Sequence, residues 1–195
     1  NMINNNSQQL DTGFSCGILR HRGAILLLLI VTLSYVGELT LNAQWLAGYG
    51  YRKRLDIQES QIPGAAALTN FPVLVDITDD DLKPCSSSGY MENLNGWDIR
   101  FTSDNGTTTL YHDIEGYDVV TGRLTVWVQI PSLSATVNTT IYLYYGNPSI
   151  VANSSSANTW NAFYRGVWHF NGTVDDVTSN NNDGTFNSTT SIAGN

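Results

Sequence analysis

Alternating apolar and polar positions run through the middle of the chain, and they are typical of β-strands. In a strand, successive side chains point to opposite faces, so a period of two marks a sheet with one buried face. Four such runs, rich in β-branched and aromatic residues and separated by turn sequences, are 97–102, 110–115, 124–130 and 139–147. Two further runs, 51–57 and 71–77, precede them. The pattern predicts an all-β protein, an antiparallel β-sandwich of jelly-roll type.

The apolar faces of these runs predict the core. The side chains expected to be buried together are Ile57, Val73, Val75, Ile99, Phe101, Ile114, Val126, Val128, Ile141 and Leu143. His112 shares an apolar face with Leu110 and Ile114. That position favours a hydrogen-bonded core histidine over a metal ligand or a catalytic base.

The N-terminal region has the pattern of a secretory signal. A basic cluster at 20–22 precedes an apolar run at 23–36. This run is shorter than the roughly 20 apolar residues that a membrane-spanning helix needs. Ala43 is the predicted cleavage point, and residues 1–17 form a polar extension without apolar periodicity. We therefore expect a signal helix within 1–43 and a secreted or cell-surface protein; the alternative is an uncleaved anchor or a buried core helix.

The rest of the chain divides into three predicted parts. Residues 44–150 contain the strand runs and form the expected β-sandwich domain. Residues 151–163 are a polar linker of low complexity. Residues 164–195 hold at most two strands, too few for an independent sheet. We interpret this part as the truncated start of a second β-domain.

Charge and cysteine content narrow the class of protein. The net charge is −8, which argues against nucleic acid or an anionic membrane surface as a partner. Only 13% of residues are charged, as suits an extracellular β-protein with polar uncharged turns. Of the two cysteines, Cys16 precedes the predicted cleavage point. Cys85 would then be alone in the mature chain, and we expect it to be a buried structural thiol.

Three aromatic residues form the first candidate site. Trp127 points away from the apolar face of its run, and Tyr142 and Tyr144 point away from theirs. Strands that are neighbours in sequence usually lie close together, so the three rings are expected to share one surface. Such a strip would stack on sugar rings. Alternatively, a loop or a neighbouring domain covers these rings, because aromatic side chains bury readily.

Charged residues form the second candidate site. An Asn105-Gly106 turn predicts a hairpin that puts Arg100 beside Asp113 or Glu115. This arrangement is either a polar ligand site or an ordinary cross-strand ion pair.

Acidic runs give little support for a metal site. Residues 79–81 are all aspartates but lack the spacing of a calcium loop, so a solvated turn is expected. Asp175, Asp176 and Asp183 offer oxygen ligands for calcium only in a complete second domain. For this chain we expect no cofactor and no effect of calcium on melting.

Several short motifs together resemble a known family. They are Tyr51-Arg52-Lys53, the run 68–75, Asp98-Ile99-Arg100-Phe101-Thr102, Ile114-Glu115, Trp127-Val128 and the run 142–147. From about Trp45 to Pro148 the chain is similar to domain-of-unknown-function family 2341. The resemblance implies a secreted or surface module of a large multidomain bacterial or archaeal protein, and it carries no catalytic residues. Asp113 stands where the family is expected to have Glu, which leaves Glu115 as the steadier acidic position.

The C-terminal part resembles a different domain. The runs 166–170 and 182–185 are similar to the opening of a concanavalin A-like, laminin-G-like lectin domain. Such domains often follow the first family in surface proteins, so the resemblance implies adhesion or glycan binding.

These features predict a non-enzymatic binding module. Its expected ligand is a neutral polysaccharide or cell-surface glycan, because the chain is acidic. Two alternatives stay open: a structural spacer that presents a lectin-like domain, and the non-catalytic part of a glycoside hydrolase. A catalytic assignment lacks support, since the chain has no Glu-x-Asp-x-x-Glu run and no Gly-x-Ser-x-Gly motif.

Overall fold

The structure is a computed structural model that describes residues 3–9 and 45–186. These residues form eight strands and four short 3-10 helices. The strands are β1 (Ile3–Gln9), β2 (Tyr51–Ile57), β3 (Leu68–Thr78), β4 (Arg100–Ser103), β5 (Thr109–Leu110), β6 (His112–Asp118), β7 (Arg123–Leu133) and β8 (Thr139–Tyr145). The 3-10 helices are η1 (Glu59–Gln61), η2 (Asp80–Leu82), η3 (Cys85–Ser87) and η4 (Ala157–Thr159).

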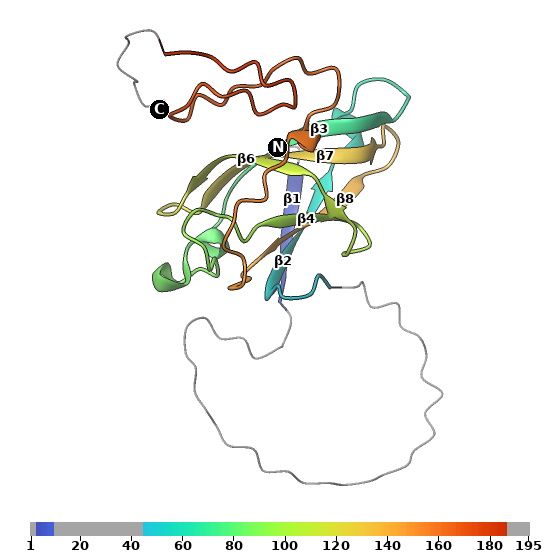
Figure 1. Ribbon diagram of the computed structural model, residues 1–195. Helices are drawn as coiled ribbons and strands as arrows, with labels where there is room; N and C mark the ends of the chain where they lie inside the picture. The colour runs from blue at the N-terminus through green and yellow to red at the C-terminus, as the bar shows by residue number, and fades with distance from the viewer. Residues whose placement is uncertain (1–2, 10–44, 187–195) are drawn as a thin grey trace, which may run out of the picture.

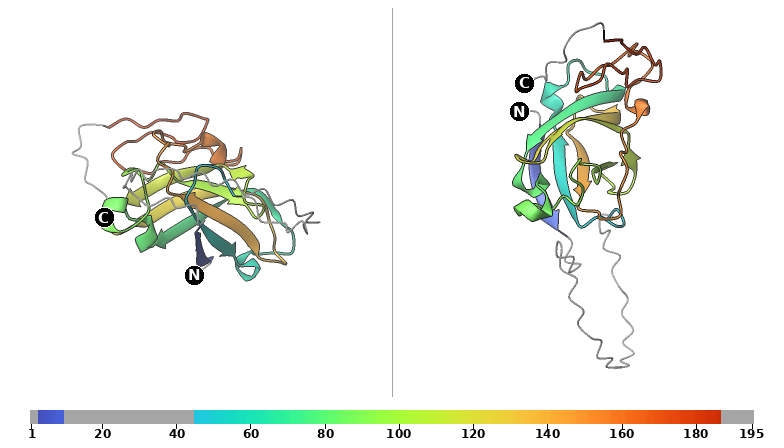
Figure 2. Two further views of the ribbon diagram at one scale, coloured as in Figure 1. Left: turned by 90° about the horizontal axis from the view of Figure 1, so that it is seen from below. Right: turned by 60° about the vertical axis from the view of Figure 1, so that its left-hand side comes forward.

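The strands form two antiparallel sheets that face each other (Figures 1 and 2). A five-stranded sheet has the order β1-β2-β8-β4-β5, and a three-stranded sheet has the order β3-β7-β6. The all-β, antiparallel prediction is therefore confirmed. The described residues contain no α-helix, and none of their helices is long and apolar enough to cross a membrane.

The core between the two sheets consists of the strand faces that the sequence predicted to be buried. Of the ten side chains expected to be buried, all are buried except Ile114, which is half-buried against the core. Val126 and Val128 alternate with Trp127, whose side chain points to the outside of the three-stranded sheet. The two-residue period thus assigned the faces of β7 correctly.

His112 is the hydrogen-bonded core residue that the sequence predicts. Its side chain is buried, its ring lies 5.5 Å from that of Phe101, and its Nε2 lies 3.0 Å from Oγ of Ser154. Burial, helped by the charge of Arg100, lowers the pKa of His112 to about 4. The imidazole is therefore neutral at physiological pH.

The prediction that Trp127, Tyr142 and Tyr144 share one surface is wrong. Although β7 and β8 are consecutive, β7 lies in the three-stranded sheet and β8 in the five-stranded sheet. The chain crosses from one sheet to the other between Leu133 and Thr139. Trp127 therefore points to one outer face of the sandwich, while Tyr142 and Tyr144 point to the opposite one.

The hairpin predicted at Asn105-Gly106 forms between β4 and β5, but it does not place Arg100 beside Asp113 or Glu115. β4 and β5 pair in the five-stranded sheet, but after Leu110 the chain crosses to the other sheet and continues as β6. Arg100 is instead opposite Tyr144 of β8. Its Nη1 donates to the carbonyl oxygens of Trp97 (3.2 Å) and Ile99 (2.6 Å) and to Ser154 Oγ.

The structure corrects the expectations for the N-terminal residues and for Cys85. Residues 3–9, for which the polar sequence predicted no element, form β1 at the edge of the five-stranded sheet beside β2. Cys85 is half-buried and disulfide-bonded, so it is not the buried thiol that we expected. The other cysteine, Cys16, and the predicted signal segment at 20–43 lie outside the described residues.

The C-terminal segment, residues 151–186, contains no strand among its described residues. It runs beside the three-stranded sheet, seen in orange and red in Figure 1. Hydrogen bonds tie its start to β6: besides the contact between Ser154 and His112, Ser156 N donates to the carbonyl of His112 (2.9 Å), and Ile114 N donates to Ser155 Oγ (2.9 Å). The boundary between a first and a second domain stays a prediction.

Candidate functional site

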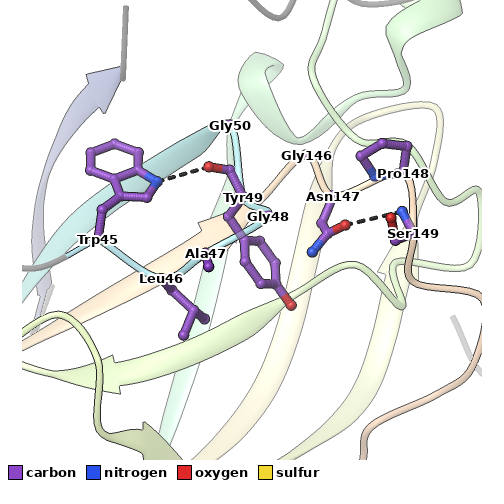
Figure 3. A pocket seen from close by; sticks show the side chains of 10 residues that line it. All are labelled: Trp45, Leu46, Ala47, Gly48, Tyr49, Gly50, Gly146, Asn147, Pro148 and Ser149. Atoms are coloured by element: carbon purple, nitrogen blue, oxygen red, sulfur yellow. Dashed lines mark hydrogen bonds between the residues drawn. The ribbon is translucent and has the colours of Figure 1, made fainter. Parts of the chain in front are cut away.

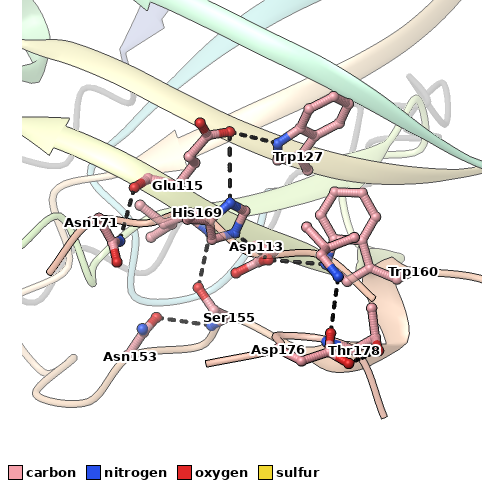
Figure 4. Close-up of polar contacts among 12 residues, drawn as sticks. Asp113, Glu115, Trp127, Asn153, Ser155, Trp160, His169, Asn171, Asp176 and Thr178 are labelled. Atoms are coloured by element: carbon pink, nitrogen blue, oxygen red, sulfur yellow. Dashed lines mark hydrogen bonds and ion pairs between the residues drawn. The ribbon is translucent and has the colours of Figure 1, made fainter. Parts of the chain in front are cut away.

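Polar and aromatic side chains meet on the outer face of the three-stranded sheet (Figure 4). β6 contributes Asp113 and Glu115, and β7 contributes Trp127. The C-terminal segment contributes Trp160 and His169. We call these five residues the outer-face cluster. The register between β6 and β7 shifts between Ile114 and Gly116, so Glu115 occupies a β-bulge, a device that re-aims side chains near functional sites.

Hydrogen bonds, an ion pair and a contact between the two indole rings connect the cluster. Asp113 Oδ2 accepts from Trp160 Nε1 (3.0 Å) and lies 2.9 Å from His169 Nε2. Glu115 Oε2 accepts from Trp127 Nε1 (2.7 Å) and lies 3.8 Å from His169 Nδ1. The two indole rings pack with their centroids 5.2 Å apart. The imidazole thus lies between two carboxylates and holds the C-terminal segment on the sheet.

The two carboxylates favour the charged form of His169. The hydrogen bond to Asp113 raises its pKa most; burial opposes this, and the charges of Asp113 and Glu115 add to it. The side chain is only 7% exposed, so water screens these interactions weakly. At mildly acidic pH the charged imidazolium of His169 therefore bridges Asp113 and Glu115.

This ion triad predicts a pH-dependent attachment of the C-terminal segment. Because the pKa of His169 is raised in the fold above its usual 6.5, its stabilising effect is complete below that value and is lost as pH rises through the higher pKa. We expect amide exchange at residues 160–171 to accelerate above neutral pH. Hydrogen-exchange mass spectrometry from mildly acidic to alkaline pH measures this, after correction for the intrinsic exchange rate. In His169→Gln the corrected exchange at acidic pH should be faster than in the wild type, and it should not accelerate further as the pH rises. If the variant has the same pH profile as the wild type, the triad does not hold the segment.

A pocket of about 240 Å³ opens beside the cluster. It lies between β6, the loop before β4 and the C-terminal segment, and we call it the Glu115 pocket. Its lining residues are Leu94, Asn95, Trp97, Ile114, Glu115, Gly116, Tyr117, Asn153 and Asn171. The Glu115 side chain is 38% exposed, so its carboxylate belongs both to the cluster and to the pocket.

Some polar groups of the pocket form hydrogen bonds within the protein. Asn171 Nδ2 donates to the Glu115 carbonyl (3.3 Å), Asn153 Oδ1 accepts from Ser155 N (2.9 Å), and the Tyr117 hydroxyl donates to the Leu82 carbonyl (2.6 Å).

Other groups in the pocket are available to a ligand. Among them are Glu115 Oε1, Asn153 Nδ2, Asn171 Oδ1 and Trp97 Nε1, none of which has a hydrogen-bond partner within 3–9 and 45–186. These four atoms alone give the pocket two oxygen acceptors and two N–H donors beside the Trp97 ring.

The loop that carries Trp97 is held by a buried carboxylate. Asp98 Oδ2 accepts from Glu92 N (2.9 Å) and Gly146 N (3.1 Å), and Oδ1 accepts from Asn93 N (3.2 Å). Gly96 has a φ of +72°, and a Cβ there would lie 2.9 Å from the Tyr117 ring. Glycine is therefore needed for the loop to pack against the pocket wall.

The two tyrosines of the expected strip are packed on the opposite face. Tyr144 is fully buried; its hydroxyl donates to the Gly106 carbonyl (2.8 Å) and accepts from Arg52 Nη1 (3.2 Å). The Arg52 guanidinium lies 4.3 Å from the Tyr142 ring and 4.6 Å from that of Trp45. Arg52 and Trp45 thus cover the rings that we expected to be a stacking surface.

A second pocket, of about 370 Å³, lies at the end of this face (Figure 3). Two chain segments line it, with Trp45, Leu46, Ala47, Gly48, Tyr49 and Gly50 from one and Gly146, Asn147, Pro148 and Ser149 from the other. Its polar side chains mainly bond within their own segment. Trp45 Nε1 donates to the Tyr49 carbonyl (2.8 Å), and Ser149 N donates to Asn147 Oδ1 (3.0 Å).

The acidic residues considered for calcium have other partners. Asp79 and Asp81 pair with Lys53, so only the exposed Asp80 matches the expected solvated turn. Asp176 accepts hydrogen bonds from the backbone N–H groups of Val167 and Asn182, each at 2.9 Å, and from Thr178. Although burial opposes it, this bonding lowers the pKa of Asp176 to about 2. Among the described residues no group of three or more His, Cys, Asp or Glu side chains has an arrangement that could hold a metal ion.

The sequence pointed to Asp113, Glu115 and Trp127, and the structure brings these three together. It missed Trp160, His169 and Asn171, which come from a segment without strand periodicity. Aromatic residues inside an otherwise polar stretch were the available signal, but Trp160 falls in the predicted linker, and His169 and Asn171 fall in the predicted second domain.

Comparisons with known proteins find that part of the chain is similar to one family. No curated protein and no solved structure matches the chain. The match to the family described as "Domain of unknown function (DUF2341)" covers residues 95–186. It confirms the expected resemblance over that part and continues through the C-terminal segment, which we had compared with a lectin domain. Residues 95–186, which carry the outer-face cluster and most of the Glu115 pocket, are thus similar to the DUF2341 family.

Proposed function

We propose that this chain is a non-catalytic carbohydrate-binding module of a secreted or cell-surface protein, and that a glycan binds in the Glu115 pocket. The observation that supports this proposal most is the set of polar groups without partners around Trp97. Sugar hydroxyls both donate and accept hydrogen bonds. The carboxylate and the two amides match them in both roles, while the indole offers an apolar face.

The size and charge of the site limit the kind of glycan that can bind. Pockets for drug-sized ligands usually measure about 300–1,000 Å³, so a volume of about 240 Å³ suits one or two sugar rings. The net charge of −8 and the Glu115 carboxylate favour a neutral glycan over an acidic one. With so few contacts we expect weak binding, with a Kd on the order of 0.1 to 1 mM for a short oligosaccharide.

Trp97→Ala should weaken binding to the best neutral polysaccharide by about tenfold or more, which corresponds to roughly 1.4 kcal/mol. The reason is that this change removes the ring and its N–H donor together. Affinity electrophoresis on a panel of neutral polysaccharides measures the effect, and Asn171→Ala tests the amide separately. Tyr111→Ala is the matched control, because Tyr111 is a 52% exposed aromatic residue that does not line the pocket. Equal mobility of wild type and Trp97→Ala on every polysaccharide contradicts the proposal.

A second candidate is a structural spacer that presents a lectin-like domain beginning near residue 164. The packing of the predicted stacking residues favours this candidate: Trp127 lies against Trp160, and Tyr144 is fully buried. In that case the cluster serves only to attach the C-terminal segment. The spacer would be favoured if the wild type bound no glycan while its C-terminal segment remained attached to the three-stranded sheet.

A further inference from the structure

A lysine lies inside the sandwich. Lys53 follows Tyr51 and precedes Leu55 on the inward face of β2, and its side chain is only 3% exposed. Lysine is almost never buried unless it is paired. Here Nζ contacts Oδ2 of Asp79 and lies 3.4 Å from Oδ2 of Asp81. Both acids come from the turn that follows β3.

We propose that Lys53 and Asp79 form an intramolecular isopeptide bond, and that Asp81 transfers protons in this self-catalysed reaction. The inference is independent of sugar binding, because these residues lie outside the Glu115 pocket.

The reaction balances without an external reagent. A proton passes from the Lys53 ammonium to the Asp81 carboxylate, and the neutral amine attacks Cγ of Asp79. A C–N bond forms, and the C–O bond to Oδ2 breaks. Oδ2 leaves as water with two of the three ammonium protons, while the third stays on the amide nitrogen. Asp81 ends as the carboxylate with which it began.

The geometry around Asp79 suits this attack. Oδ1 accepts the backbone N–H of Asp81 at 3.0 Å, so a donor is already in place where negative charge develops on the tetrahedral intermediate. The Asp79 N–H donates to the Gly122 carbonyl at 3.2 Å, which fixes the backbone. Held between these two bonds, the carboxylate presents Oδ2 to the amine, and such positioning supplies much of the rate of an intramolecular reaction.

Asp81 is positioned for proton transfer. Its Oδ2 is the atom 3.4 Å from Lys53 Nζ, and the Tyr145 hydroxyl, also buried, donates to that same oxygen at 3.3 Å. The Asp79 and Asp81 side chains are 19% and 31% exposed, so the released water has an exit.

The bond would join the two sheets covalently. Lys53 belongs to β2 of the five-stranded sheet, whereas Asp79 directly follows β3 of the three-stranded sheet. A cross-link between residues 26 positions apart restricts the unfolded chain and resists separation of the sheets.

Peptide mass spectrometry of the reduced, alkylated wild-type chain tests the proposal. Trypsin cleaves after Arg52 and Arg54 but not before Pro84, so the next cleavage follows Arg100. We expect Lys53-Arg54 to remain attached to the peptide of residues 55–100, with the mass of the two peptides minus one water and the branch at Asp79. Free Lys53 and an unbranched 55–100 peptide from folded protein would overturn the proposal.

Variants test the roles of the acids. Asp79→Ala should abolish the branched peptide, and Asp81→Asn should slow its appearance at least tenfold after refolding. Lys83→Ala is the matched control: Lys83 pairs with the exposed Asp80 at 2.7 Å in the same turn, so the branched peptide should persist. A branched peptide that survives Asp79→Ala would overturn the assignment of the acyl group. If a variant fails to fold, the measurement on the wild type still decides whether the isopeptide bond exists.

Discussion

Phe101→Ala is expected to lower the free energy of unfolding by about 3–5 kcal/mol. Phe101 is 0% exposed, and in the five-stranded sheet it lies opposite Leu143 on one side and Leu110 on the other. Its ring also packs against His112 of the opposite sheet. Removing the ring leaves a cavity where the two sheets meet, and the rigid strands around it cannot collapse to fill it.

Urea unfolding followed by tryptophan fluorescence measures this loss. Tyr111→Ala is the control, because the side chain is 52% exposed at the crossing between the sheets, and its removal should change stability by no more than about 0.5 kcal/mol. Equal midpoints for wild type and Phe101→Ala would mean that the core does not lie between these two sheets.

Asp98→Ala is expected to cost at least about 3 kcal/mol, because three backbone N–H groups lose their acceptor and a buried unsatisfied group costs about 1–3 kcal/mol. Asp98 is 0% exposed. Burial raises its pKa, and the N–H groups of Glu92, Asn93 and Gly146 oppose that rise. These bonds tie the loop before β4 to the end of β8. The substitution should therefore also weaken sugar binding, since this loop carries Trp97.

Asp98→Asn is the matched control. It keeps the shape and one acceptor oxygen but replaces the other by an NH₂ donor, so it should lose less stability than Asp98→Ala. Thermal unfolding of the three proteins at neutral pH measures the order. If Asp98→Ala unfolds at the wild-type temperature, the loop is not held by this carboxylate.

The local pattern of the sequence determined the strands and their faces. In β7, for example, Val126 and Val128 are buried while Trp127 points outward, as a period of two requires. The same pattern placed Phe101, Ile141 and Leu143 in the core. This information is local because the pleat of a strand fixes the direction of each side chain relative to its neighbours in the chain.

Part of the candidate site was predictable for the same reason. The alternation in β6 put Asp113 and Glu115 on one face, and the structure keeps them together. Their partners His169 and Trp160 were not predictable. They lie in a segment without periodicity, so only its hydrogen bonds to the sheet decide where it runs.

The tertiary structure alone decided which strands share a sheet. The crossings at Tyr111 and between Leu133 and Thr139 separate Arg100 from Asp113 and Trp127 from Tyr142, although each pair is close in sequence. Likewise, the period of two turns Lys53 inward, but only the meeting of the sheets brings it to Asp79. The physical reason is that side-chain direction follows from the backbone of one strand. Strand partners, in contrast, depend on long-range hydrogen bonding and on closing a core between two sheets.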